Sequence, residues 1–133
     1  MMGKVWTGGG HMSKEVLEAA YGHFANWPAG KQQFEALLDP DVLWIENDRE
    51  LGAGNYRGKA DVMAHLDHIQ GHLASASLVS VSQKPPGWET RDNMQVQGHD
   101  LHCCISDIDF NGDLIKQVHH CKNHGQVGRG PCP

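Results

Sequence analysis

The chain has 133 residues, a length that fits one domain with one core and one pocket and that requires neither metal nor disulfide bonds for folding. The net charge is −5 with His neutral, and no run of Lys or Arg exceeds two residues, so a surface that follows a phosphate backbone is disfavoured. No apolar run approaches the ~20 residues of a membrane span. The composition therefore predicts no nucleic-acid partner and no contact with a membrane.

Four cysteines, Cys103, Cys104, Cys121 and Cys132, bear on the cellular compartment. Adjacent cysteines on a strand point to opposite faces, and this spacing is unlike that of a secreted disulfide scaffold. We expect free thiols in a reducing compartment. Together with the lack of a hydrophobic segment of signal-peptide length near residue 1, this predicts a cytoplasmic protein.

Composition divides the chain into three parts. Residues 1–12 are glycine-rich and aperiodic and contain Gly-His-Met, a sequence typical of a cloning remnant; the alternative is a native flexible arm. Residues 13–122 carry the regular pattern of a folded domain. Residues 123–133 hold three glycines and two prolines, which predicts a flexible tail.

Three helices are predicted from the spacing of apolar residues. The first begins at Ser13, which can cap it, and is closed by Pro28. A short second helix covers about residues 31–38, because Pro40 disfavours helical geometry just before it. The third covers about residues 59–73, with a narrow apolar stripe that should pack on a sheet.

The strands are predicted from alternating residues. Val42, Trp44 and Glu46 share one face of the first strand, and residues 47–57 read as a loop. After about residue 74 the apolar period changes from 3.6 to 2. The later strands are predicted near 78–81, 88–97, 101–110 and 114–122, the last two joined by a tight turn at Asn111-Gly112-Asp113.

The order of these elements resembles the nuclear transport factor 2-like superfamily, which includes ketosteroid isomerase, the SnoaL-type polyketide cyclases and scytalone dehydratase. The resemblance rests on residues 37–46, a helix end followed by a strand that finishes on an acidic residue, and on residues 55–62, where a new helix begins. It covers about residues 13–122. It implies an α+β cone, in which a curved, mixed and mostly antiparallel sheet wraps around three helices.

Strand parity predicts which side chains enter the cone. If Phe110 pairs with Leu114, then Ser106 faces Val118, Cys104 faces His120, and His102 faces Lys122. A register error of one residue would exchange the two faces. The concave face should collect Trp44, Glu46, His102, Cys104, Ser106, Val118 and His120, and the outer face Cys103, Ile105, Asp107, His119 and Cys121.

The resemblance to ketosteroid isomerase implies roles for three positions. Tyr21 falls on that family's oxyanion-donating tyrosine, and Glu46 falls on its catalytic carboxylate. Ser106 falls on the second oxyanion donor, a protonated aspartic acid. Because serine is not an acid of comparable strength, the comparison favours general acid/base chemistry over steroid isomerisation itself.

We therefore predict a pocket in which Glu46 has a raised pKa and abstracts a proton beside a carbonyl group, assisted by Tyr21, His102 or His120. The ordinary alternatives are that Glu46 reaches solvent and that Tyr21 is a core aromatic residue with a bonded hydroxyl. The predicted ligand-binding residues are Phe24, Trp44, Cys104, Ser106 and Val118.

Metal binding and cysteine catalysis are the competing chemistries. His65, His68 and His72 lie within one arc of the third helix, but an arc beside an apolar stripe is usually a solvated flank, and the helical zinc motif is lacking. Cys104 opposite His120 could bind zinc or act as a nucleophile. No further residue visibly completes either site, so we predict no metal and no cofactor.

Two function classes follow. One is a cofactor-independent isomerase, cyclase or dehydratase acting on a hydrophobic carbonyl compound; the other is a noncatalytic ligand-binding or dimerisation module of the same fold. A homodimer is expected through the outer sheet face, because Leu43, Ile45, Cys103 and Ile105 would otherwise form an exposed apolar patch.

Overall fold

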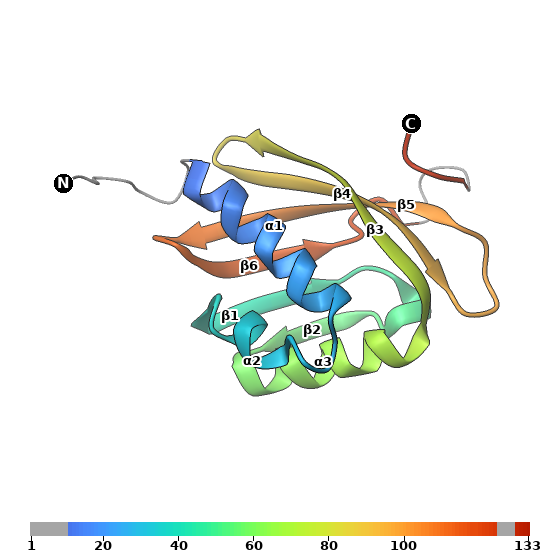
Figure 1. Cartoon of the computed structure of the whole chain (residues 1–133), viewed down its shortest axis with the longest axis horizontal. Helices are drawn as coiled ribbons and strands as arrows, with labels where there is room; N and C mark the ends of the chain where they lie inside the picture. Colours follow the sequence, from blue (N-terminus) through green and yellow to red (C-terminus); the bar gives the residue numbers. More distant parts are fainter. Residues whose placement is uncertain (1–10, 125–129) are drawn as a thin grey trace.

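The computed structural model describes residues 11–124 and 130–133, which form three α-helices, one short 3-10 helix and six strands (Figure 1). The α+β class predicted from the sequence is confirmed. In chain order the elements are α1 (His11–Ala25), α2 (Lys31–Glu35), β1 (Leu38–Glu46), η1 (Arg49–Leu51), β2 (Gly54–Arg57), α3 (Lys59–His72), β3 (Leu73–Lys84), β4 (Gly87–Val96), β5 (His102–Asn111) and β6 (Leu114–His120).

The six strands form one curved sheet in the order β2-β1-β6-β5-β4-β3. All neighbouring pairs are antiparallel except β1 and β6, which run parallel. Helix α1 crosses one face of the sheet, and α3 lies against β1 and β2 (Figure 1). The sheet is therefore mixed and mostly antiparallel, as predicted, and its concave face holds the core.

Two boundaries of the sheet differ from the predictions. The short strand β2 occupies residues predicted as a loop and pairs with β1 through Trp44 and Tyr56. Its side chains are mostly exposed, so the sequence carries no alternation that would reveal a strand. Strand β3 begins at Leu73, directly after α3, whereas the prediction began at Leu78. The prediction was late because the Ala and Ser residues at the start of β3 show no alternation of apolar and polar side chains.

The register of the last hairpin is shifted from the prediction by two residues. Leu114 pairs with Asn111 rather than Phe110, and a bulge between Asp109 and Phe110 adds a second residue of shift, so Val118 lies opposite Ile108, not Ser106. A slip of two residues keeps each side chain on its face, whereas a slip of one would reverse it. The predicted concave face is therefore largely retained.

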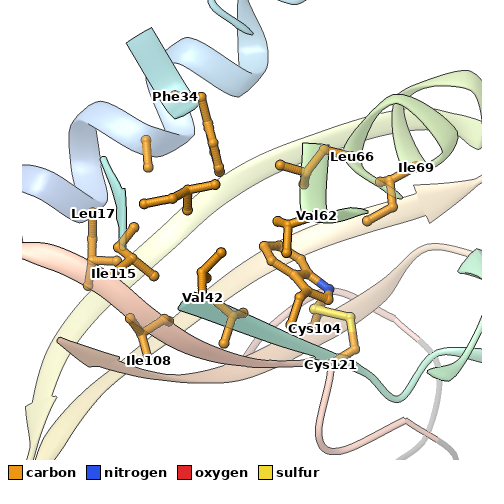
Figure 2. Close-up of a cluster of buried hydrophobic side chains, with 14 of the residues drawn as sticks. Leu17, Phe34, Val42, Val62, Leu66, Ile69, Cys104, Ile108, Ile115 and Cys121 are labelled. Carbon is orange, nitrogen blue, oxygen red and sulfur yellow. A yellow bond between two sulfur atoms is a disulfide. The ribbon is translucent and has the colours of Figure 1, made fainter. Parts of the chain in front are cut away.

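The prediction of free thiols is wrong. Cys104 is bonded to Cys121 and Cys103 to Cys132, and the described residues hold no free cysteine. Figure 2 shows the Cys104–Cys121 bond at one end of the buried apolar cluster. The outer-face placement of Cys121 is also wrong, because its backbone has φ of 49° just after β6 and its side chain turns inward.

The segment after β6 is held to the sheet at its described residues. The side chain of Asn123 accepts a hydrogen bond from the backbone N–H of Ile105 and donates one to the carbonyl of Cys103. Cys132 is bonded to Cys103, and Gly130 forms a bridge with His102. These described residues of the predicted tail therefore contact the sheet, and residues 1–10 and 125–129 lie outside the described part.

Within the described residues, no helix is long and apolar enough to cross a membrane. The cytoplasmic location stays a prediction, and its argument from free thiols no longer holds.

Candidate active site

A cavity of about 70 Å³ lies between α1 and the concave face of the sheet. Its wall is apolar except for four polar residues. Of the predicted ligand-binding residues, Phe24, Trp44, Ser106 and Val118 line it, and Cys104 does not. The polar residues on the wall are Tyr21, Asp92, Ser106 and His120.

Glu46, at the end of β1, is fully engaged beside this cavity. Both of its carboxylate oxygens lie 2.9 Å from His120 Nδ1, and Oε1 also lies 2.9 Å from His65 Nε2. It also accepts hydrogen bonds from Trp44 Nε1 at 3.1 Å and from the backbone N–H of Asp48 at 3.2 Å. With only 2% of its surface exposed, Glu46 is a buried carboxylate whose acceptor sites are occupied.

The pKa of Glu46 runs opposite to the prediction. Burial acts to raise it, but the charge and hydrogen bond of His120, together with the hydrogen bonds of His65 and Trp44, lower the pKa of Glu46 to about 2. Burial acts to lower the pKa of His120, and Glu46 more than offsets this, so that the pKa of His120 is raised. The two groups form a buried ion pair, and the cavity wall among the described residues does not include Glu46.

His65 corrects a second expectation. Its side chain is buried, lies against Glu46 and stacks on the ring of Tyr56 with centroids 3.9 Å apart. The border of an apolar helical stripe was expected to be solvated, but β2 covers this part of α3. The histidine pattern of the helix was therefore a signal for a buried network.

Asp92 is the functional candidate that the sequence reasoning missed. It lies on β4, is 2% exposed and lines the cavity. Burial raises the pKa of Asp92 to about 6, with the charge of Glu46 adding to the rise, while His120, Tyr21 and His102 oppose it. The signal was present: Asp92 shares strand parity with the buried Trp88 and Met94, so its carboxyl had to point inward.

Tyr21 reaches the same polar patch from α1. Its hydroxyl lies 2.9 Å from Thr90 Oγ1 and donates to Asp92 Oδ1 at 3.4 Å. Burial and the charge of Asp92 raise the pKa of Tyr21 well above its usual value, so the hydroxyl keeps its proton. Tyr21 and Asp92 are thus a donor and a titratable carboxyl on one wall.

The Cys104–Cys121 bond closes the other side of His120. The Nε2 atom of His120 lies 3.7 Å from Cys104 Sγ and 3.9 Å from Cys121 Sγ. Ser106 Oγ accepts a hydrogen bond from the backbone N–H of Cys121 at 3.0 Å. A bonded sulfur is no nucleophile, so cysteine catalysis does not fit this structure.

His102 lies apart from the cavity wall. Its Nε2 is 3.5 Å from Asp48 Oδ2, and His124 Nε2 is 3.5 Å from Asp48 Oδ1. The proximity of Asp48 raises the pKa of His102 although burial opposes it. Burial acts to raise the pKa of Asp48, but His102 and the backbone N–H of Glu50 lower it. The structure thus places His102 in a second cluster and leaves Tyr21 and His120 at the cavity.

No protein-family model matches the sequence, and no curated protein matches it. Solved structures do match this chain. An NTF2-like protein of unknown function from Burkholderia pseudomallei is 15% identical, with a TM-score of 0.67 over 82% of this chain and 88% of that chain. TerC, crystallised with polyporic acid, has the same identity and TM-score over 82% and 89%.

A third structure has a ketosteroid isomerase-like fold, comes from Catenulispora acidiphila and was solved in complex with trimethylamine. It is 7% identical, with a TM-score of 0.65 over 80% of this chain and 83% of that chain. The chain has the nuclear transport factor 2-like fold. At these identities the likeness establishes the NTF2-like fold alone, and the chemistry has to be argued from the site.

Proposed function

We propose that this NTF2-like protein binds a compact, hydrophobic carbonyl compound in the cavity and moves a proton on it without a cofactor. The observation that carries the proposal is Asp92, a buried carboxyl with a pKa raised to about 6 on an apolar wall. A group with a pKa near the working pH combines the deprotonated state with sufficient basicity. Asp92 thus replaces Glu46 as the proposed base.

The proposed step is abstraction of a proton from the carbon next to the carbonyl. The carboxylate of Asp92 takes the proton, and the electrons of the C–H bond move to the carbonyl oxygen to give an enolate. The same carboxyl then returns the proton to another carbon or to oxygen, so the step needs no other reactant. A positioned general base typically contributes ~10²- to 10⁴-fold.

His120 and Tyr21 supply the charge stabilisation in this proposal. His120 is held as a cation by Glu46, and its positive charge acts on the same wall as Asp92. The Tyr21 hydroxyl is protonated and can donate to the developing oxyanion. Glu46 is a positioning residue, since it acts through His120.

Noncatalytic ligand binding is the second candidate, and cavity size favours it. Small-molecule sites usually enclose ~300–1,000 Å³, whereas this cavity has about 70 Å³. A ligand of few heavy atoms fits without rearrangement of the walls. Such a protein could hold a small molecule without transforming it.

Hydrogen–deuterium exchange separates the two candidates. We would screen small cyclic ketones and 1,3-dicarbonyl compounds in D₂O by NMR, reading binding from protein shifts and proton abstraction from loss of the α-proton signal. We expect Asp92→Asn to retain binding and to slow exchange by ~10²-fold or more. Asp113→Asn, an exposed aspartate in the β5–β6 turn, is the matched control and should exchange as the wild type does.

Two outcomes would contradict the acid/base proposal. Binding without exchange in the wild-type protein would favour the binding module. Exchange that persists unchanged in Asp92→Asn would remove Asp92 as the base.

The homodimer belongs to the proposal as well. In the single chain Leu43, Ile45 and Ile105 are half-buried, and Cys103 is covered by its bond to Cys132. A partner copy on the outer face would bury the exposed remainder of these side chains. Light scattering at micromolar concentration should give twice the chain mass, and a monomer mass would refute the dimer.

A further inference from the structure

Three side chains from distant parts of the sequence meet at the second cluster. Asp48 precedes η1, His102 begins β5, and His124 follows β6. Each imidazole presents Nε2 to a different oxygen of Asp48 at 3.5 Å. The Asp48 side chain has no exposed surface, and those of His102 and His124 are 10% and 20% exposed.

Two atoms of this cluster are buried without a hydrogen-bond partner among the described residues. They are Asp48 Oδ2 and His102 Nε2, and they face each other. His102 Nδ1 lies 3.5 Å from the carbonyl oxygen of Asp100, so both nitrogens of this ring face an oxygen at the same long distance. A buried carboxylate oxygen and a buried imidazole nitrogen that face each other without a hydrogen bond leave a place for a cation between them.

The distances favour a metal ion over a shared proton. A direct N–H···O hydrogen bond spans ~2.7–3.2 Å, which is shorter than the separations here. Zinc binds nitrogen and oxygen at ~2.0–2.2 Å in a tetrahedron, so two neighbouring ligand atoms lie about 3.4 Å apart. Each histidine lies at that distance from one oxygen of Asp48, and binding of one ion would draw the two imidazoles closer together, because the donor atoms of the three residues do not all lie within 4.8 Å of one another.

We propose that Asp48, His102 and His124 bind one divalent transition-metal ion of the zinc type. Two imidazoles and a carboxylate select Zn²⁺, Co²⁺ or Ni²⁺ over Mg²⁺ and Ca²⁺. The backbone N–H of Glu50 donates to Asp48 Oδ1 at 2.8 Å and fixes the carboxylate, as outer hydrogen bonds do in metal sites. A fourth position remains for water.

This site lies apart from the cavity of the proposed acid/base function. None of its three residues is on the cavity wall within the described chain. The Sγ of Cys121 lies within 4.8 Å of the Asp48 and His102 donor atoms, but it is bonded to Cys104 and offers no thiolate. The set is therefore two histidines and one carboxylate.

Calorimetric titration with Zn²⁺, at neutral pH and without reductant, tests the proposal. We expect one ion per chain, and at least tenfold weaker binding in each of Asp48→Asn, His102→Gln and His124→Gln. Co²⁺ should give the visible absorption of a tetrahedral ion in the wild type and lose it in His124→Gln. Because His124 is partly exposed, that variant should fold even if a change at the buried His102 does not.

The control is the double variant His68→Gln/His72→Gln, whose rings lie together on α3 with centroids 4.2 Å apart and could bind Zn²⁺ by themselves. It should bind as the wild type does. Loss of binding in this control, with binding retained in His124→Gln, would overturn the proposal and assign the metal to α3. The proposal would also be overturned if the folded wild type bound no Zn²⁺ and NMR showed both nitrogens of His102 to be protonated. A proton would then lie between Asp48 Oδ2 and His102 Nε2.

Discussion

Two carboxylates near the end of β1, two residues apart, each face two histidines with different results. Glu46 lies 2.9 Å from His65 and His120, within hydrogen-bond distance. Asp48 lies 3.5 Å from His102 and His124, beyond it. The same residue types thus form a closed ion pair in one place and an open set of ligands in the other. A difference of 0.6 Å between these separations, not composition, distinguishes the two clusters.

The Cys104–Cys121 bond separates the two clusters. Cys121 Sγ lies 3.9 Å from His120 Nε2 on one side and within 4.8 Å of the donor atoms of Asp48 and His102 on the other. It therefore acts as an apolar partition, and the comparison between the clusters can be tested on either side of it.

The largest expected effect is that of Glu46→Gln. The variant keeps the shape and removes the charge opposite His120, and loss of one partner of a buried ion pair costs ~3–5 kcal/mol. Since the pKa of Glu46 is lowered to about 2, its contribution is present above pH 4.5 and disappears as pH falls toward 2. Urea unfolding of wild type and variant across this pH range should show the difference in their free energies of unfolding becoming smaller as the pH falls.

Asp67→Asn is the matched control for Glu46→Gln. Asp67 pairs with Lys31 at 2.9 Å on the surface, where such pairs contribute less than ~1 kcal/mol. Equal, small losses in both variants would mean that the Glu46 cluster is not a buried ion pair.

Removal of the partition by the double change Cys104→Ala/Cys121→Ala should have the next largest effect. The cysteines are 17 positions apart in the sequence, and loss of this loop constraint lowers the free energy of unfolding by ~3 kcal/mol. The NMR signals of the His120 ring should shift because two sulfur neighbours are removed.

Cys103→Ala/Cys132→Ala provides the comparison for that variant. Its loop of 29 residues predicts a loss of similar size, but the bond lies on the outer side of β5. The His120 signals should therefore stay in place. Equal shifts in both double variants would contradict a partition at Cys104–Cys121.

Asp92→Asn should change the pH dependence of stability. The pKa of Asp92 rises on folding from 3.8 to about 6, so its favourable contribution is present below pH 3.8 and lost as pH rises through 6. This corresponds to up to ~3 kcal/mol at ~1.36 kcal/mol per pKa unit. Asn does not ionise, so the free energy of unfolding of the variant, relative to that of wild type, should be higher above pH 6 than at pH 3.5 by up to this amount. A difference independent of pH would contradict a raised pKa.

The sequence predicted the frame of the site better than its chemistry. The resemblance to ketosteroid isomerase placed Tyr21 on the cavity, and strand parity placed His120 there despite a register slip of two residues. The partner of Cys104 could not be read in this way, because the backbone turn at Cys121 breaks the alternation. Asp92 was accessible by parity, but its pKa depends on burial by α1, which only the fold supplies.

The smallest expected effect is that of Asp48→Asn in metal-free protein, and it decides the comparison most directly. The Asn oxygen can still accept the hydrogen bond from the Glu50 N–H, and the atom that changes has no hydrogen-bond partner among the described residues. We therefore expect a loss of about 1 kcal/mol or less, well below that of Glu46→Gln. In Zn²⁺ at 100 times its Kd the gap should widen by ~2.7 kcal/mol, because only the wild type gains stability from the ion. Thermal and urea unfolding with chelator and with Zn²⁺ measure both values. A loss as large as that of Glu46→Gln in the presence of chelator would mean that Asp48 is already closed in an ion pair with His102 and His124, and the two carboxylates would then be alike.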